Sequence, residues 1–169
     1  MDAMKINADF NLKVVIKPEE MTWNPSPVPG INRAYLDRVG GEVAKASSIV
    51  KYKPNSTFTQ HEHGEGEEIL VLDGTFSDEN GNYSAGTYLR NPPNSKHSPY
   101  SKTGCTLFVK LRHFHPEDIA IVKINTQTEI WHQGLVPGLS VMPLHEFNGV
   151  GTALVKWAPN TIFNPHVHP

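Results

Sequence analysis

The feature that most constrains the fold is an internal repeat with a long period. Residues 23–30 match residues 131–138, since both segments begin with Trp and end with Val-Pro-Gly, and the offset is 108 residues. Residues 50–58 match residues 155–163 at an offset of 105 residues. A period this long predicts two copies of a whole domain rather than the short units of a solenoid.

The two copies differ in how much of the domain they contain. We expect a complete domain over residues 12–118 and the opening strands of a second copy over residues 119–169, which stop after His166-x-His168. The three residues lost between the offsets are expected in a hairpin around Gly40. The sequence leaves open whether the second set of strands is cut short, completes the first barrel or completes a partner subunit.

Short apolar runs separated by turn residues favour an all-β fold. The runs are rich in Val, Ile, Phe and Tyr and end at Gly, Pro or Asn-containing turns. They cover residues 14–16, 43–52, 69–72, 88–90 and 106–111. None shows a sustained 3.6-residue period, and the 13 glycines and 14 prolines are spread along the chain. The pattern therefore predicts a β-sandwich or β-barrel.

Composition excludes several classes of function. The net charge is −2 and no basic block occurs, so we expect no nucleic-acid partner. No stretch approaches the roughly 20 apolar residues of a membrane span, so we expect no membrane partner. The single cysteine, Cys105, permits no internal disulfide and is expected to be a buried, inert thiol. Together these features predict a cytoplasmic protein.

A cluster of histidines and a glutamate predicts a mononuclear metal site. His61 and His63 are two residues apart, so on a strand they face the same side. Glu67 follows after two glycines that let the chain bend, and His97 ends a separate Pro-rich turn. Three imidazoles and one carboxylate suit Zn, Fe(II), Ni, Mn or Cu(II) better than Mg or Ca.

Other side chains are further candidates for a functional site. Tyr88 and Arg90 share a strand face before His97 and could line the pocket and bind an anionic or carbonyl ligand, or could be a packed Tyr beside a solvent-facing Arg. His113 and His115 form another His-x-His, which we expect on the surface. The repeated pair, His166 and His168, would be a vestigial second site, because two ligands hold a metal poorly.

These motifs resemble those of the cupin superfamily. The first cupin motif, G-x5-H-x-H-x3–4-E-x6-G, matches residues 55–74 with Asn55 in place of the opening Gly. The second, G-x5-P-x-G-x2-H-x3-N, matches residues 86–101 with Asn94 and Ser101 in place of Gly and Asn. Asn tolerates positive φ, so the first two departures are mild. The resemblance implies an RmlC-like jelly-roll β-barrel, in a duplicated (bicupin) arrangement, with His61, His63, Glu67 and His97 as metal ligands.

Residues 67–93 and 104–112 are similar to the ChrR group of cupins. That resemblance implies a zinc-binding cupin related to anti-sigma factors, with Fe(II) dioxygenases of small diketones and hydroxylated aryl ketones as relatives. The sigma-binding domain of that group carries a His-x3-Cys-x2-Cys motif, which this sequence lacks, so we do not expect the chain itself to clamp a sigma factor.

Three functions remain open at this point: a sensor or regulatory module, a dioxygenase, and a cupin that binds or isomerises a small molecule without metal chemistry. The complete ligand set disfavours the third. The same four ligands serve the first two, so the sequence does not decide whether the protein is an enzyme. We rank the regulatory module first, with one zinc ion, and the Fe(II) dioxygenase second. A homodimer is expected, since the exposed edges of cupin barrels need covering.

Overall fold

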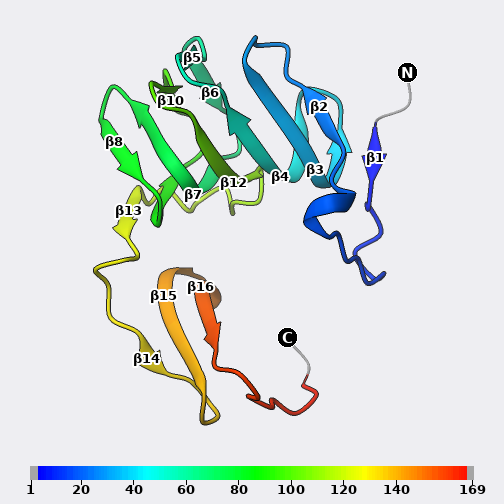
Figure 1. Cartoon of the computed structure of the whole chain (residues 1–169), viewed down its shortest axis with the longest axis vertical. Helices are drawn as coiled ribbons and strands as arrows, with labels where there is room; N and C mark the ends of the chain where they lie inside the picture. Colours follow the sequence, from blue (N-terminus) through cyan, green and yellow to red (C-terminus); the bar gives the residue numbers. More distant parts are fainter. Residues whose placement is uncertain (1–3, 167–169) are drawn as a thin grey trace. The chain divides into compact units, whose positions relative to one another are not determined.

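The computed structural model describes residues 4–166 and is built almost entirely of β-strands (Figure 1). The chain divides after Lys123 into two compact units. The elements of the first unit are β1 (Lys5–Ile6), η1 (Pro18–Glu20), β2 (Trp23–Pro25), β3 (Ile31–Gly40), β4 (Ala44–Tyr52), β5 (Ser56–Thr57), β6 (His61–His63), β7 (Glu67–Asp78), β8 (Gly81–Ser84), β9 (Thr87–Asn91), β10 (Ser95–His97), β11 (Tyr100–Ser101) and β12 (Cys105–Leu111). β13 (Val122–Asn125) crosses the boundary, and β14 (His132–Gln133), β15 (Leu139–Phe147) and β16 (Val150–Trp157) follow. The predicted all-β class is confirmed.

The first unit is organised around one large antiparallel sheet. Its strands run in the order β1-β3-β4-β12-β7-β11-β5, with β2 beside β3 and with β8 and β9 beside β7. β6 and β10 form a separate two-stranded sheet. Because β7 and β12 lie in the middle of the order, their side chains have neighbours on both sides, and these strands carry most of the core.

The core follows from the alternation of apolar residues along β7 and β12. Ile69, Val71, Leu107 and Val109 all lie on one face and are buried, together with Phe76. Side chains two apart on a strand face the same way, so this alternation gathers the apolar groups on the inner face of the sheet. Burying each such side chain contributes about 1.5–3 kcal/mol to folding.

β7 does not end at Asp73-Gly74. We expected the run 69–72 to end there, but β7 continues to Asp78 and pairs with β8. The register with β12 shifts between Val71 and Asp73, so that Leu72 forms a bulge, and Gly74 just after it has a φ of 74°. A Cβ at this position would lie 2.2 Å from the carbonyl oxygen of Gly104, so only glycine fits. The bulge turns the second half of β7 in a new direction.

Two regions near the N-terminus differ from expectation. Residues 14–16 were expected to form a strand, but Val14 and Val15 are exposed and form none. β3 was not predicted, because its apolar residues are interrupted by the polar Asn32 and by charged residues such as Arg33. It is nevertheless a long strand, since it pairs with β2 and β1 on one side and with β4 on the other.

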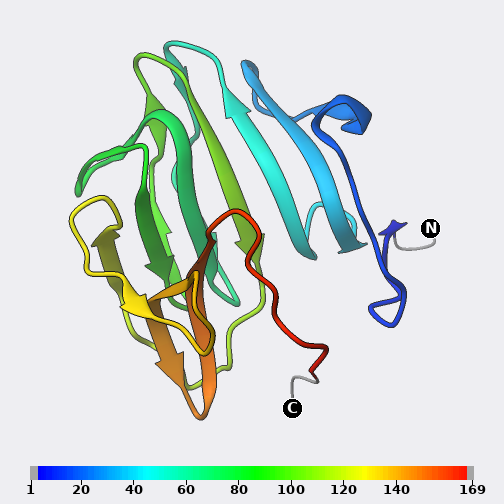
Figure 2. The same cartoon turned by 60° about the horizontal axis from the view of Figure 1, so that its bottom comes forward.

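The second unit contains one antiparallel sheet in the order β14-β15-β16 (Figure 2). Its pairing repeats that of β2, β3 and β4. Leu139 pairs with Trp157 as Ile31 pairs with Tyr52, which keeps the offsets of 108 and 105 residues. Both long hairpins also have a register shift at the corresponding place, after Tyr35 in the first and after Pro143 in the second.

The turns of the two hairpins account for the change of offset. In the first hairpin Val39 pairs with Lys45, and in the second Phe147 pairs with Val150. The second turn is therefore three residues shorter, and this hairpin is where we expected the lost residues.

Two glycines show that the likeness between the β3–β4 and β15–β16 hairpins extends to individual contacts. Gly30 and Gly138 have φ values of 81° and 86°. A Cβ on Gly30 would lie 2.4 Å from the hydroxyl of Ser56, and one on Gly138 would lie 2.3 Å from the hydroxyl of Thr161. The same close approach is therefore built twice, with glycine required at both positions.

Cys105 is buried at the start of β12, as expected. Burial raises the pKa of its thiol to about 11, partly offset by a hydrogen bond with Ser101. The thiolate is the reactive form, so at neutral pH this cysteine is an inert part of the core.

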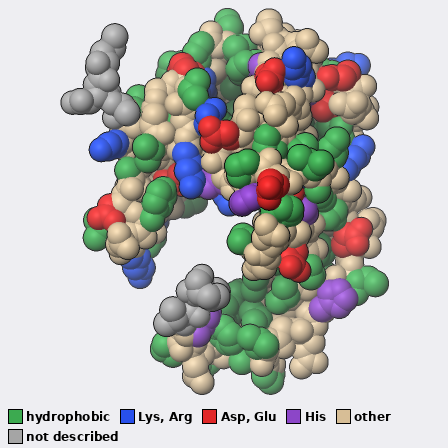
Figure 3. Space-filling model, turned by 180° about the vertical axis from the view of Figure 1, so that it is seen from behind, with side chains coloured by type: hydrophobic (Ala, Val, Ile, Leu, Met, Phe, Trp, Pro, Cys, Tyr) green, Lys and Arg blue, Asp and Glu red, His purple; other side chains and the backbone are tan. Residues whose placement is uncertain are grey.

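The surface of the described chain carries mixed charge. On the face seen in Figure 3, Lys and Arg side chains lie among Asp and Glu side chains and no basic patch gathers. Among the described residues no helix is long and apolar enough to cross a membrane.

Candidate metal centre

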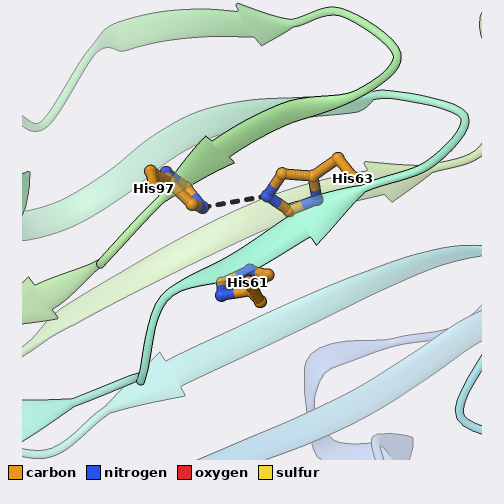
Figure 4. Close-up of side chains that lie close together, drawn as sticks. All are labelled: His61, His63 and His97. Carbon is orange, nitrogen blue, oxygen red and sulfur yellow. Dashed lines mark hydrogen bonds between the residues drawn. The ribbon is translucent and has the colours of Figure 1, made fainter.

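The small sheet of β6 and β10 places three histidines together. His61 and His63 are two residues apart on β6 and share a face. In the antiparallel register His97 of β10 lies opposite His61, and Ser95 lies opposite His63. Figure 4 shows the three imidazoles turned toward one another from these two strands.

The three rings are close enough to share one ion. One nitrogen from each of His61, His63 and His97 lies within 4.8 Å of the others. The Nε2 atoms of His63 and His97 are 2.9 Å apart, and both rings are buried, while His61 is partly exposed. Aromatic rings could stack here for packing alone, but nitrogens that converge this closely form a donor set rather than an apolar contact.

Glu67 completes the donor set from the main sheet. Its Oε2 lies 3.2 Å from Nε2 of His63 and 3.6 Å from Nε2 of His97. The bend before β7 requires Gly66, which has a φ of 80° and whose Cβ would lie 2.5 Å from the ring of Phe114. The structure therefore brings together the four ligands expected from the sequence.

One hydrogen bond and one nearby carboxylate lie behind the ligands. Nδ1 of His61 is hydrogen-bonded to the carbonyl oxygen of Thr59 at 3.1 Å, whereas Nδ1 of His97 lies 3.6 Å from Oδ2 of Asp78, which is too far for a hydrogen bond. The acceptor at Nδ1 of His61 favours the proton there and leaves its Nε2 lone pair free to bind a metal. Asn91 donates a hydrogen bond of 3.2 Å to Oε2 of Glu67.

Asp78 and Asn91 were missed by the sequence analysis. Asp78 lies on β7 beyond the bulge at Leu72, and a bulge of this kind is not visible in an apolar pattern. Asn91 lies opposite Glu67 in the pairing of β9 with β7, and its only signal in the sequence is that it directly precedes the Pro-rich turn.

The electrostatics of the site favour a bound cation. Burial, and to a smaller extent the neighbouring His61, lowers the pKa of His63 to about 4. Burial also lowers the pKa of His97, although Glu67 opposes this shift. Burial raises the pKa of Glu67, while His97, Asn91 and His61 lower it. At neutral pH the buried imidazoles are uncharged, which is the form that ligates metals.

A cavity of about 250 Å³ adjoins the histidines. Apolar side chains from β3, β4, β7 and β12 make most of its wall. The lining includes Ile31, Val50, Tyr52, Phe58, Ile69, Phe76, Leu107, Val109 and Leu111, and its charged members besides Glu67 are Arg33, Glu42, Glu62 and Arg112. A donor set at one end of an apolar chamber is the arrangement expected of a site for a small ligand.

Tyr88 and Arg90 are not among the residues that line this cavity. β9 pairs with β7 so that Glu67 lies opposite Asn91 and Glu68 lies opposite Arg90. Side chains alternate, so Arg90 lies with Glu68 on the face opposite the metal ligands. The register of β9 on β7 therefore shows that Tyr88 and Arg90 do not line the pocket, as we had expected they could.

Arg90 instead organises a buried ionic network on the other face of the sheet. Its guanidinium donates 2.6 Å to Oε1 of Glu68 and also to Asp118, and it stacks over the ring of Phe114. The hydroxyl of Tyr88 donates 2.5 Å to the same Glu68 oxygen. The network fixes the segment after β12 against the sheet.

His113 and His115 are not members of the three-histidine cluster. His115 is exposed, as expected, but His113 is partly buried and Nε2 of His113 is enclosed without a hydrogen bond among the described residues. The ring of His166 packs against Phe163 at 4.4 Å, as His61 packs against Phe58 at 4.7 Å. His168, its expected partner in a vestigial site, lies outside the described residues.

The two Asn substitutions in the motifs behave as expected. Asn55 and Asn94 have φ values of 62° and 66°. Both occupy the left-handed conformation that glycine usually provides, and Asn is among the residues that tolerate it.

The fold and the donor set together define a cupin. The family model of the ChrR cupin-like domain matches residues 11–115, and the chain belongs to this family. The predicted RmlC-like cupin fold is thereby confirmed, and RmlC-like cupins are among the solved structures that match. The sequence matches no curated protein.

Three solved structures illustrate the likeness. The complex of SigE with the anti-sigma protein ChrR from Rhodobacter sphaeroides matches with 23% identity over 56% of this chain and 50% of that chain, at a TM-score of 0.47. A candidate glyoxylate-induced protein from Pseudomonas aeruginosa matches with 12% identity over 81% of this chain and 59% of that chain, at 0.64. A candidate acetylacetone dioxygenase from Methylibium petroleiphilum matches with 20% identity over 69% of this chain and 95% of that chain, at 0.50. The chain thus spans between half and three fifths of the first two structures, and at these identities the likeness concerns the fold.

Proposed function

We propose that this protein is a metal-dependent regulatory module of the ChrR-like type, which holds one zinc ion through His61, His63, Glu67 and His97. The observation that carries the proposal is the convergence of these four side chains from two different sheets. A zinc ion at this position would act as a Lewis acid and would neutralise the charge of Glu67.

The residues around the donor set prepare it for that role. The carbonyl oxygen of Thr59 is hydrogen-bonded to the outer nitrogen of His61, and the carboxylate of Asp78 lies 3.6 Å from that of His97, where it would stabilise a proton on this nitrogen when a metal binds the other. Since the ligands reach the ion from separate elements, loss of the ion changes how those elements are held, which is a change that a regulatory partner can detect.

A second function, an Fe(II)-dependent dioxygenase of a small diketone or hydroxyaryl ketone, is favoured by the cavity. A purely structural metal needs no chamber beside it, whereas a substrate does. The four ligands are the same in both functions, so the metal and the chemistry must be measured.

Elemental analysis of protein purified without added metal, combined with oxygen uptake on a panel of diketones, separates the two. We expect about one zinc ion per chain and no oxygen uptake beyond the metal-free control. Iron at a similar occupancy with uptake on any diketone would reject the regulatory function and establish the oxygenase. Absence of any bound metal would reject both.

Residues 119–169 are proposed to be the opening part of a second cupin copy, after a complete cupin in residues 12–118. The repeated pairing register and the paired close contacts of Gly30 and Gly138 support this bicupin arrangement. The module is proposed to act in the cytoplasm.

We also propose a homodimer. β16 pairs with β15 along one edge, and several of its apolar side chains, including Val150, Val155 and Trp157, are exposed. A strand with such side chains is protected when another chain covers it. The mass in solution, measured by light scattering during size-exclusion chromatography, should be twice that of one chain, and a monomer mass across the micromolar range would contradict this.

A further inference from the structure

A single arginine on β3 points into the apolar cavity. Arg33 follows the buried Ile31 by two residues, so both side chains face the interior, and both line the cavity. The side chain of Arg33 is only 15% exposed. Charged groups are rarely placed in such surroundings unless a partner compensates them.

The partners of Arg33 compensate its charge weakly. Its terminal nitrogens lie 3.4 Å from Oε2 of Glu42, and one of them donates 2.9 Å to the hydroxyl of Ser26. The Glu42 side chain is 69% exposed in the turn between β3 and β4, where water screens it. A guanidinium offers five donors, so it can bind a second carboxylate in the cavity in place of Glu42.

Tyr52 provides a polar group close to the same wall. It is two residues after Val50 on β4 and faces the same side of the strand, and Val50 pairs with Arg33 of β3. Its hydroxyl makes no hydrogen bond with the described residues, although the ring packs on the core. Burial, Glu67 and Cys105 raise the pKa of this phenol while Arg33 lowers it, so at neutral pH the hydroxyl is a hydrogen-bond donor facing the cavity.

The other arginine of the wall, Arg112, is engaged differently. Its guanidinium is paired with Glu65, in a contact closer than the one between Arg33 and Glu42. This leaves Arg33 as the better anchor for an incoming anion.

We propose that the cavity selects a small carboxylate ligand that binds at both ends, with oxygen donors directed to the histidines and a distal carboxylate held by Arg33. The inference rests on the proposed function for the metal end of the ligand, and it names the class of molecule that the site takes: a short oxo-dicarboxylate rather than a neutral diketone. Without a ligand, the guanidinium of Arg33 pairs with Glu42, and the ligand carboxylate competes with Glu42 for it.

The test compares ligands that differ only at the distal end. Zinc-loaded protein is titrated by calorimetry with oxaloacetate and 2-oxoglutarate, and with 2-oxobutanoate and 2-oxopentanoate, which have the same oxo-acid head and no second carboxylate. We expect at least one dicarboxylate to bind about 10-fold or more tightly than its monocarboxylate counterpart, since hydrogen bonds to charged groups contribute this much. Equal affinities within both pairs would overturn the inference.

Three variants locate the anchor. Arg33→Met should abolish the discrimination and leave the monocarboxylates unchanged. Glu42→Gln should act in the opposite direction and tighten the dicarboxylate by roughly two- to fivefold, because it removes the competing charge. Lys51→Met is the matched control: it removes one positive charge from β4, but Lys51 lies over the Trp23 ring and is not part of the cavity lining, so discrimination should persist.

Three further outcomes would also test the assignment to Arg33. If Arg112→Met rather than Arg33→Met abolishes discrimination, the assignment to Arg33 is wrong. If Arg33→Met fails to fold, the Glu42→Gln result decides, and an unchanged dicarboxylate affinity in that variant rejects the anchor. If the protein holds no metal yet still binds a dicarboxylate in a manner that depends on Arg33, the inference stands and the proposed function fails.

Discussion

His63→Ala and Glu67→Ala each remove metal binding, whereas His113→Ala does not. His63 and Glu67 converge on the shared position, while His113 is outside the three-histidine cluster. Loss of a direct ligand should weaken zinc binding by roughly 100-fold or more, since even residues that only orient ligands contribute about 10–100-fold. Competition with a chromophoric chelator measures these affinities.

The same titration separates ligands from orienting residues. Asp78→Asn keeps the shape of the side chain but removes its charge near Nδ1 of His97, and zinc binding should fall by about 10–100-fold. Circular dichroism of the metal-free variants confirms that the strands remain. Equal loss in His63→Ala, Glu67→Ala and His113→Ala would show that the metal site has been placed incorrectly.

Arg90→Met lowers the free energy of unfolding by about 3 kcal/mol, because it removes the cation that two buried carboxylates share, although Lys110 still lies 3.5 Å from Glu68. The side chains of Arg90 and Glu68 are each 7% exposed and that of Asp118 is 2% exposed, so water cannot replace the lost contact. Urea unfolding followed by near-ultraviolet circular dichroism measures the change.

Arg112→Met is the control for the Arg90 prediction. Its partner Glu65 is 58% exposed, so this ion pair should contribute less than about 1 kcal/mol. The difference between the two variants isolates the effect of burial from that of removing an arginine. A loss in Arg90→Met no larger than in Arg112→Met would mean that the network does not stabilise the sheet.

The metal ligands could be predicted from sequence because local rules place them. Pleating puts His61 and His63 on one face, glycines allow the bend before Glu67, and a Pro-rich turn delivers His97. Each of these steps involves a few neighbouring residues. The family motif adds the only non-local information, namely that His97 returns to the same point.

Features that depend on pairing between distant strands could not be predicted. The faces of Tyr88 and Arg90 follow from the register of β9 on β7, and a shift by one residue would have reversed them. β3 was missed because its charged residues break the apolar pattern, although Arg33 is one of the side chains that give the cavity its character. Asp78 lies beyond a bulge in its strand, and the sequence does not show that bulge.

The division of the ligands between two sheets has a mechanical consequence. The imidazoles lie on the short β6–β10 ribbon, whereas the carboxylate lies at the start of β7 in the large sheet. One ion bound by all four groups is a cross-link between a small element and the body of the fold. A bound metal ion should therefore make the backbone of β6 and β10 more rigid. Slower amide hydrogen exchange in these two strands would report that the ion is bound.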